Sequence, residues 1–491
     1  MINSNALDAI PAGIQKPGYD RSRVKVGIAH FSVGNFHRAH QAVYVDQCLA
    51  LGGHDEWGIL GIGLIDNASE TAKAKALQGQ SGLYSLSVYP PEGTPTVSII
   101  GSIVGYLHAP DDPEAVLERL VDPAIRIVTM TVTEGGYNTD EKGRFKLEEP
   151  GVARDLTSDI PSTVFGYITE ALRRRRDTGV GPFTVLSCDN LRHNGRVAEH
   201  ALLTFARAKD AALAEWIETY VTFPSCMVDR ITPAVSAADA ARLNGETGLD
   251  DAAPIFAEDF IQWVVEDRFC AGRPALERVG VQFTADVDPY EQVKLRMLNA
   301  SHCMMAFPGT LIGHRIVHLA MADSRISTLL GQFLSIDAGP LLNAPPGMST
   351  TEYGDLLLRR YRNPAIGDQL LRICSDGASK LPVFVQDTAK ALIQHRADHR
   401  RVAYLLACFT EYLNGVDDKG ESFPVVEPNV TEADRALAAD PDLSQGLGMS
   451  VFKGWALDQS PGFSADYANY RAAIRQQGAG ATLQTLLTEV G

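Results

Sequence analysis

The chain has 491 residues, of which 45% are hydrophobic and 21% charged, and its formal net charge is −16. This length exceeds what one hydrophobic core accommodates, so we expect a globular protein with two large domains. The negative charge disfavours nucleic acid or an anionic membrane as a partner, because both require a basic face. The sequence contains no apolar run of the roughly 18 residues that would predict a membrane span.

The cysteines and the first residues bear on the compartment. Seven cysteines are scattered along the chain, and none forms a C-x-x-C pair. This pattern is typical of reduced thiols in a cytosol and lacks the spacing of a structural zinc site. Residues 1–21 lack the basic-then-apolar pattern of a secretory signal. We therefore expect a cytoplasmic protein that holds no metal.

The first half of the chain alternates strand and helix patterns. Such alternation indicates an α/β fold with a parallel, doubly wound sheet of Rossmann type. The later patterns are mainly helical, which gives a dinucleotide-binding domain of residues 1–286 and a mainly α-helical C-terminal domain of residues 287–491. The predicted elements are strands at Val24–Val33, Trp57–Ile65, Ile125–Val132, Phe183–Ser187 and Gln282–Val287, and a helix at Phe36–Leu51.

The segment after the first predicted strand is a candidate nucleotide-binding turn. Residues 32–39 read SVGNFHRA, to be compared with the dinucleotide fingerprint G-x-G-x-x-G/A. Gly34 lies where the backbone approaches a pyrophosphate, and the next amides open a helix whose N-terminus favours anions. We assign Gly34, Asn35 and Phe36 to the cofactor site. Ser32 replaces the first glycine of the fingerprint, so an ordinary strand-to-helix turn also fits the bare pattern.

Three further polar residues follow predicted strands, at the edge where open α/β sheets bind ligands. Asp66 ends the second strand and can accept hydrogen bonds from a ribose 2′-hydroxyl; no arginine follows it closely, which predicts NAD rather than NADP. Glu134, in the segment TEGGY, is a candidate cofactor contact. Asn190, after Cys188-Asp189, can aim its amide at a reacting oxygen, although capping of the next turn is an alternative.

Residues 288–308, DPYEQVKLRMLNASHCMMAFP, carry the most informative pattern of the chain. Asp288 as N-cap and Pro289 at the first helical position predict the start of a helix, and Pro308-Gly309 predicts its end. The helix is apolar on most sides, which predicts a buried helix.

Polar side chains share one side of this predicted helix. At about 100° per residue they fall within an arc of about 140°. Because burial of an unpaired charge costs several kcal/mol, the cluster points to the wall of an active site. A lysine there can act as a general base, since burial disfavours the ammonium and lowers its pKa. Taken singly, the lysine is also consistent with a solvated side chain and the histidine with a structural one. The polar residues are Glu291, Lys294, Asn299 and His302.

Several blocks together resemble one family. Residues 222–233, TFPSCMVDRITP, are similar to the signature of the polyol-specific long-chain dehydrogenases, the mannitol dehydrogenase and fructuronate reductase family. The blocks TVTEGGY and QWVVEDRF most resemble members that interconvert mannitol and fructose. Further matches are GNFHRAHQA at 34–42, TVTEGGY at 131–137, SCDNLRHNG at 187–195, QWVVEDRF at 262–269 and KLRMLNASH at 294–302.

The resemblance implies a Rossmann-type domain and a helical domain with the active site between them, and no metal. It implies that Lys294 is the general base, that Asn190 and Asn299 hold the alcohol or carbonyl oxygen, and that His302 orients the substrate. Asp229-Arg230 is also consistent with a plain ion pair. Substrate contacts are implied for Val228, Asp229, Glu291 and Arg372.

The implied reaction is the NAD-dependent, metal-independent oxidation of D-mannitol to D-fructose and the reverse reduction. Alternatives within the family are a fructuronate or tagaturonate reductase and a D-arabinitol dehydrogenase. Tyr290-x-x-x-Lys294 matches the catalytic pair of short-chain dehydrogenases, but the glycine-rich loop of that class is missing. A non-catalytic dinucleotide sensor would lack the base, and Lys294 is present. We expect a monomer or small homo-oligomer with a small-molecule polyol or ketose as substrate.

Overall fold

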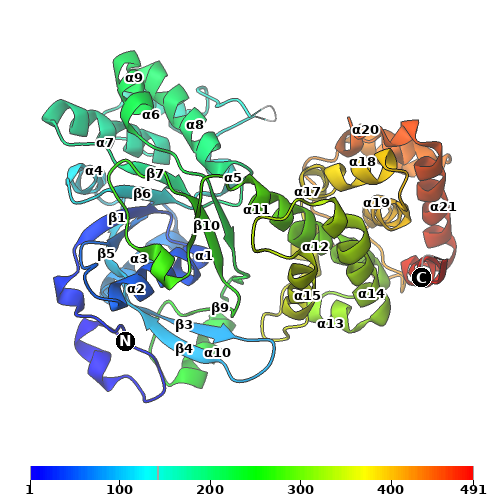
Figure 1. Cartoon of the computed structure of the whole chain (residues 1–491), viewed down its shortest axis with the longest axis horizontal. Helices are drawn as coiled ribbons and strands as arrows, with labels where there is room; N and C mark the ends of the chain where they lie inside the picture. Colours follow the sequence, from blue (N-terminus) through cyan, green and yellow to red (C-terminus); the bar gives the residue numbers. More distant parts are fainter. Residues whose placement is uncertain (1, 141–142, 490–491) are drawn as a thin grey trace. The chain divides into compact units, whose positions relative to one another are not determined.

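The computed structural model describes residues 2–140 and 143–489. The chain forms two compact units, a first unit of Met1–Asp288 and a second unit of Pro289–Gly491. The first unit, blue to green in Figure 1, contains every named strand of the described residues. The second unit, green to red, is built of helices.

A five-stranded parallel sheet forms the centre of the first unit, in the order β5-β2-β1-β6-β7. The chain winds outward from β1 to one edge and then returns beside β1 to wind toward the other edge. This reversal creates a topological switch point at the carboxyl ends of β1 and β6, where such sheets bind ligands. The predicted Rossmann-type sheet is thereby confirmed. Its strands are β1 (Val26–Phe31), β2 (Gly58–Gly63), β5 (Ile103–His108), β6 (Ile127–Met130) and β7 (Thr184–Ser187).

Alternate residues of these strands pack against different helix layers. Val128 and Val185 belong to one buried cluster, whereas Ile127 and Leu186 belong to another. Because successive strand side chains point to opposite faces, both faces are buried, and the strands read as continuous apolar runs. One cluster includes α4 (Pro113–Val121), α6 (Pro150–Thr157), α7 (Val164–Thr178), α8 (Asn194–Lys209) and α9 (Ala211–Tyr220); the other includes α1 (Asn35–Ala39), α2 (Gln41–Ala50) and α3 (Ala68–Gly79).

Two three-stranded sheets complete the first unit, with β10 between β11 and β8, and β3 between β4 and β9. β10 runs antiparallel to β8 and parallel to β11, while β3 runs antiparallel to β4 and parallel to β9. The elements are β3 (Tyr84–Tyr89), β4 (Thr96–Ile100), β8 (Cys226–Asp229), β9 (Ile255–Glu258), β10 (Gln262–Glu266), β11 (Gln282–Thr284), the helices α5 (Thr133–Gly136) and α10 (Ala237–Thr247), and the short helices η1 (Ser4–Ala9), η2 (Arg21–Arg23) and η3 (Leu276–Val279).

The predicted strands are present in shorter form, but the prediction omits six strands: β3, β4, β5, β8, β9 and β10. The single helix predicted over Phe36–Leu51 is wrong in one respect. It is divided at His40, whose φ of −125° and ψ of −88° are not helical. A ring nitrogen of His40 lies 2.8 Å from the Gln262 carbonyl oxygen, a partner far along the chain that the local pattern does not reveal.

The second unit packs its helices around one large buried cluster. Among the described residues, no helix combines the length and apolar character needed to cross a membrane. After the first helix its elements are α13 (Val317–Ala322), α14 (Ser324–Gln332), the π-helical η5 (Phe333–Ala338), η6 (Gly339–Leu341), α15 (Thr350–Tyr361), α16 (Leu370–Cys374), α17 (Gly377–Phe384), α18 (Gln386–Gln394), α19 (Arg400–Tyr412), α20 (Glu432–Ala439), η7 (Leu443–Gly448), η8 (Ser450–Phe452), η9 (Leu457–Gln459), α21 (Pro461–Gln477) and α22 (Ala479–Glu489).

The helix predicted over 288–308 is longer and less regular than predicted. Asp288 is its first residue rather than its cap. It continues through Pro308 and ends at Gly313, whose φ of 102° suits glycine. Packing overrides the proline, since the Phe307 ring lies 5.2 Å from the rings of both Phe409 and Tyr412. The helix consists of α11 (Asp288–Val293), the π-helical η4 (Lys294–Asn299) and α12 (Ala300–Ile312).

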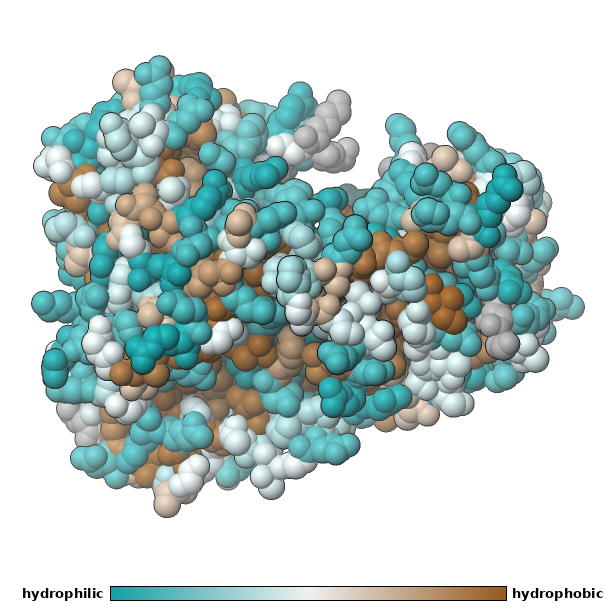
Figure 2. Space-filling model, viewed as in Figure 1, coloured by the Kyte–Doolittle hydropathy of each residue, from teal (hydrophilic) through white to brown (hydrophobic). Residues whose placement is uncertain are grey.

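Hydrophilic residues cover much of the face drawn in Figure 2. Exposed large hydrophobic side chains come from many elements rather than one, and isolated ones of this kind are normal on protein surfaces. They are Leu51, Ile65, Ile160, Tyr220, Leu319, Ile336, Val383, Val416 and Val426.

Candidate active site

Gly34 lies at the switch point of the parallel sheet, between β1 and α1. It caps α1 in an extended conformation, and the Arg38 amide donates to its carbonyl at 3.2 Å. A Cβ atom built at Gly34 would meet no neighbour closer than the Ser32 carbonyl oxygen at 4.0 Å. The backbone is therefore open at this point, which suits the close approach of a pyrophosphate. In this respect the turn fits a bound dinucleotide.

The connections after β1, β6 and β7 each contain a non-glycine residue in the left-handed region. These residues are Ser32 at φ 68°, Thr133 at φ 61° and His193 at φ 53°. Such residues cost about 1–3 kcal/mol each and persist only where the surrounding structure holds them. Thr133 is the most unusual because its side chain is β-branched. Three of the eight such residues in the described parts of the chain thus follow strands of the parallel sheet, at the edge that also holds Gly34.

Asn35 and Phe36 use their side chains within the protein. Asn35 Nδ2 donates to the Pro233 carbonyl at 3.2 Å, and its Oδ1 accepts from Arg38 at 2.7 Å. The half-buried Phe36 ring stacks on the His40 ring at 4.9 Å. Both side chains thus fix the turn itself, which leaves the backbone as the part of Asn35 most available to a cofactor.

Two buried histidines lie behind this turn. The rings of His30 on β1 and His37 on α1 stack with centroids 3.4 Å apart. His30 Nδ1 lies 2.7 Å from Thr129 Oγ1 and its Nε2 lies 3.1 Å from Thr131 Oγ1. Burial lowers the pKa of His30 to about 3 and that of His37 well below its usual value. Both rings are therefore neutral and act as packing groups near neutral pH.

Asp66 follows β2 and is exposed. The next residue, Asn67, caps α3 by accepting the Glu70 amide at 2.9 Å. Lys73 lies 2.6 Å from the Glu70 carboxylate, so this lysine is engaged by an acid on its own helix. A carboxylate at the end of the second strand is where Rossmann-type sheets meet a ribose, and this role of Asp66 stays a prediction.

Glu134 and Asn190 follow β6 and β7. Glu134 belongs to α5, but its side chain lies outside the described residues. Asn190 is exposed, whereas the preceding Asp189 is buried. The structure thus places Asn190 on the same edge of the sheet as Gly34, because parallel strands end at the same edge.

Val228 and Asp229 are buried at the end of β8, where Asp229 pairs with Gln262 of β10. The next residue, Arg230, donates to the Glu258 carbonyl at 2.8 and 3.0 Å and to the Ala39 carbonyl at 2.5 Å. Arg230 therefore ties this block to the GNFHRAHQA block. Two of the sequence blocks that define the family resemblance are neighbours in the fold.

In the second unit, Lys294 and Asn299 are the first and last residues of a π-helical segment. At about 100° per residue, an α-helix would place them about 140° apart. In a π-helix, residues five apart are joined by the backbone hydrogen bond and so lie on one face. Both residues are buried, and Asn299 Oδ1 has no hydrogen-bond partner among the residues that the structure describes. A buried amide oxygen of this kind is suited to a ligand hydroxyl.

Glu291 and His302 flank this segment on the same continuous helix. Glu291 is buried one turn before Lys294, and the half-buried His302 ring lies 4.7 Å from the Tyr361 ring. Tyr361 is itself buried and donates to the Leu298 carbonyl at 3.0 Å, with Ser301 Oγ at 2.8 Å. Tyr361 therefore holds the end of the π-helical segment and one side of His302.

Arg372 on α16 is placed differently from the other predicted substrate contacts. Its side chain is 66% exposed and forms a two-pronged ion pair with Asp368, at 2.8 and 2.6 Å. Asp368 precedes α16, and only 9% of its side chain is exposed, so the exposed guanidinium pairs with a largely covered carboxylate. The ion pair uses Nε and Nη2 of the guanidinium, and a substrate contact by Arg372 through its remaining donors stays a prediction.

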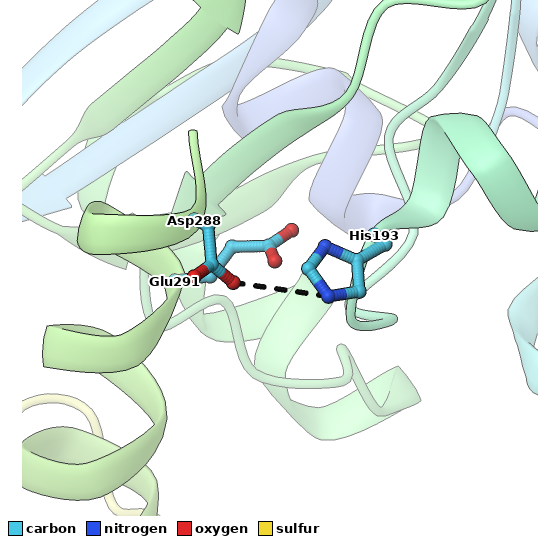
Figure 3. Close-up of side chains that lie close together, drawn as sticks. All are labelled: His193, Asp288 and Glu291. Atoms are coloured by element: carbon cyan, nitrogen blue, oxygen red, sulfur yellow. Dashed lines mark ion pairs between the residues drawn. The ribbon is translucent and has the colours of Figure 1, made fainter. Parts of the chain in front are cut away.

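His193 and Asp288 face each other in Figure 3, with Nε2 and Oδ1 3.7 Å apart. Glu291 follows Asp288 by one turn of the same helix. Imidazole and carboxylate groups are metal ligands in many proteins. The predicted independence from metal therefore calls for a direct test.

Three residues near the candidate site are absent from the sequence-based prediction. Asp189 and Tyr137 lie inside the blocks SCDNLRHNG and TVTEGGY, next to residues that the prediction does name. Tyr361 has no local signal, because its role arises from packing against a helix 60 residues earlier.

A doubly wound sheet with an open glycine turn, together with a buried lysine and amide on one helix face, is the combination expected of a nucleotide-dependent dehydrogenase. The chain matches the mannitol dehydrogenase Rossmann domain over residues 26–278 and the mannitol dehydrogenase C-terminal domain over residues 286–474. It belongs to the mannitol dehydrogenase family and is a polyol dehydrogenase, an oxidoreductase.

Similar proteins span the whole chain. A polyol:NADP oxidoreductase of Gluconobacter oxydans is 48% identical over 98% of this chain and 100% of its own. The crystal structure of a D-sorbitol dehydrogenase is 48% identical with a TM-score of 0.93, over 98% of this chain and 100% of that one. The ternary complex of Pseudomonas fluorescens mannitol 2-dehydrogenase with NAD and D-mannitol is 41% identical with a TM-score of 0.88, over 99% of both chains.

Proposed function

We propose that this protein catalyses the NAD-linked oxidation of D-mannitol to D-fructose and the reverse reduction. The observation that carries the proposal is the buried face shared by Lys294 and Asn299 on the π-helical segment. Support comes from the similarity to a mannitol 2-dehydrogenase whose structure holds NAD and D-mannitol. In this proposal residues 1–286 bind the nucleotide and residues 287–491 supply the base.

The residues divide the chemistry between them. Bound NAD supplies the acceptor for the hydride that leaves the carbinol carbon. Lys294 takes the hydroxyl proton as the carbonyl forms, and returns it in the reduction. The amides of Asn190 and Asn299 stabilise the negative charge that develops on the oxygen, a contribution of a few kcal/mol for each good donor. His302 orients the substrate.

The remaining predicted residues bind rather than react. Asp229 and Arg372 are proposed to contact substrate hydroxyls, with Val228 shaping the same wall. Glu291 is a buried carboxylate one turn before Lys294 and is suited to accept a hydrogen bond from substrate or lysine. Gly34 and Asp66 are proposed to contact the pyrophosphate and ribose, and Glu134 another part of the nucleotide.

Cofactor choice needs a direct comparison. The exposed Asp66 favours NAD, because its charge opposes a 2′-phosphate. The Gluconobacter relative is named for NADP, which makes NADP the alternative. We expect kcat/KM for polyol oxidation to be higher with NAD than with NADP.

Substrate choice is tested by a panel. The similarity to a D-sorbitol dehydrogenase favours D-sorbitol as a second candidate. Mannitol, sorbitol, D-arabinitol, fructuronate and tagaturonate should be compared by kcat/KM with each cofactor. Highest activity on mannitol and fructose supports the proposal, whereas preference for sorbitol, arabinitol or a hexuronate identifies the corresponding alternative.

We propose that the reaction needs no metal, since Lys294 supplies the base. Prolonged chelation followed by metal analysis should leave kcat unchanged. The pair His193 and Asp288 gives a specific check, because a catalytic metal there would be lost from His193→Ala together with turnover. Stoichiometric metal whose removal abolishes activity contradicts the proposal.

We propose a cytoplasmic location. All seven cysteines are free thiols, and six of them are buried. Buried unpaired thiols are typical of proteins from reducing compartments. Fractionation of the source cells with a cytoplasmic marker tests this.

A further inference from the structure

The buried carboxylate of Asp189 joins two strand ends at the edge of the parallel sheet. Its Oδ1 accepts the Thr133 amide at 2.8 Å, and its Oδ2 accepts the Val132 amide at 3.1 Å and the Tyr137 hydroxyl at 2.8 Å. Asp189 follows β7, whereas the donors follow β6. The carboxylate is thus a bridge between neighbouring connections.

The donors include the most strained residue of this edge. Thr133 has a left-handed backbone at φ 61° and a β-branched side chain. A hydrogen bond from its amide to a carboxylate is charge-assisted and stronger than a neutral one. Asp189 therefore offsets the strain and holds the turn that begins α5.

The same residue fixes the chain that leads to Asn190. Asn194 donates to the Asp189 carbonyl at 3.0 Å and to the Cys226 carbonyl at 2.7 Å. Tyr137 adds a second tie, since its hydroxyl also bonds to Ser187 Oγ in β7. Asp189 is thus held at both its side chain and its backbone, immediately before the exposed Asn190.

We propose that Asp189 is a positioning residue that sets the place of Asn190 and of the turn at Thr133 for hydride transfer. This inference rests on the proposed function, in which the Asn190 amide holds the reacting oxygen. Asp189 does not itself exchange a proton in the reaction. Its contribution is the geometry of the oxygen-holding amide, for which displacement by about 1 Å can cost about 100-fold in rate.

Asp189→Asn tests the positioning role. The NH₂ group of the new amide cannot accept the hydrogen bonds that the Val132 and Thr133 amides and the Tyr137 hydroxyl donate to the carboxylate. We expect kcat for polyol oxidation to fall about 100-fold. The Kd of NADH, measured by fluorescence titration, should change far less, and the ionisation in the pH profile of kcat/KM should keep its position. Tyr137→Phe removes one donor and leaves the others, so its loss of kcat should be smaller but of the same kind.

Asp155 provides a matched control in the same unit. It is a fully buried carboxylate that accepts the amides and hydroxyls of Ser162 and Thr163 at 2.7–3.0 Å. None of these residues belongs to the proposed site. Asp155→Asn should lower the melting temperature and leave kcat of the folded enzyme unchanged.

Asn190→Ala, assayed in parallel, distinguishes failure of the proposed role of Asn190 from failure of the positioning role of Asp189. If Asn190→Ala keeps wild-type turnover, the proposed role of Asn190 is wrong. If it loses turnover while Asp189→Asn and Tyr137→Phe behave like Asp155→Asn, only the positioning role is overturned. If Asp189→Asn does not fold, Tyr137→Phe decides, and wild-type kcat in that variant overturns the inference.

Discussion

The two units hold their candidate residues by different means. In the first unit they lie in separate connections after strands, and side chains such as Asp189 and Arg230 tie these connections together. In the second unit Lys294 and Asn299 lie on one helix, and a π-helical segment sets their common face. The first arrangement depends on many long-range hydrogen bonds, whereas the second depends on the register of one backbone.

The two arrangements should therefore respond differently to substitution. Loss of one tie in the first unit shifts one connection and leaves the sheet in place. Any change in the π-helical segment rotates all residues beyond it, by about 100° for each residue gained or lost. The predictions below test this contrast, starting with the second unit.

The largest effect is expected from Lys294→Ala. If Lys294 is the base, its removal should lower kcat for polyol oxidation by about 10³- to 10⁴-fold, near the upper range for general acid–base catalysis. Oxidation by the wild type should strengthen and ketone reduction should weaken as pH rises, because the base must be neutral for the first and protonated for the second. Rates across pH in both directions provide the measurement.

The exposed Lys453 is a control for Lys294, since it is a lysine of the same unit that lies outside the proposed site. Lys453→Ala should match the wild type in both directions. NADH binding should survive in Lys294→Ala. Near wild-type turnover in that variant, or an unchanged basic limb in its pH profile, would show that another group accepts the proton.

The sequence pattern predicts the strands that are buried on both faces and the polar residues that follow them. Apolar runs mark β1, β2, β6 and β7 because both faces of this sheet are covered. The break at His40 and the π-helical segment cannot be predicted in this way. Each is held by a partner far along the chain, Gln262 for the break and Tyr361 for the segment. Local patterns carry no information on such partners.

The second prediction compares one carboxyl group with a raised pKa from each unit, Asp46 and Glu427. Burial raises the pKa of Asp46 from 3.8 to about 6 and that of Glu427 from 4.5 to about 7. Over these windows the folded chain holds protons that the unfolded chain releases, so stability falls as pH rises. Each group contributes at most about 3 kcal/mol to this loss.

Asp46→Asn and Glu427→Gln stay neutral and should remove this part of the pH dependence. Urea unfolding at several pH values between about 4 and 8 gives the slope of the unfolding free energy. The slope should flatten for Asp46→Asn up to about pH 6 and for Glu427→Gln up to about pH 7. Slopes equal to that of the wild type would mean that both groups titrate normally.

The third prediction concerns the residue that holds the π-helical segment. Tyr361→Phe removes the hydroxyl that donates to the Leu298 carbonyl. The unfolding free energy should fall by about 1 kcal/mol, and kcat should fall about 10-fold because the end of the π-helical segment is held less firmly and Asn299 is displaced slightly. Steady-state kinetics and urea unfolding measure the two effects.

Tyr404→Phe is the matched control, since Tyr404 is also buried and donates to a backbone carbonyl, that of Ala479, at 2.9 Å. It should lose a similar amount of stability and keep its kcat. If both variants lose only stability, the π-helical segment does not depend on Tyr361. The second unit is then less sensitive to the loss of one hydrogen bond than we infer.

The smallest effect is expected at Asp66, where one exposed side chain acts alone. Because the charge is exposed, solvent screens it, and its repulsion of a 2′-phosphate should amount to at most about 1 kcal/mol. Asp66→Asn should therefore narrow the preference for NAD over NADP about 5-fold, mainly through KM for NADP.

Exposed Asp159 is a control of equal charge in the same unit, and Asp159→Asn should leave the ratio unchanged. Raising the ionic strength should shrink the difference between Asp66→Asn and the wild type, because screening weakens an exposed repulsion. A wild-type preference for NADP, or an unaltered ratio in Asp66→Asn, would show that this carboxylate does not set the choice of cofactor.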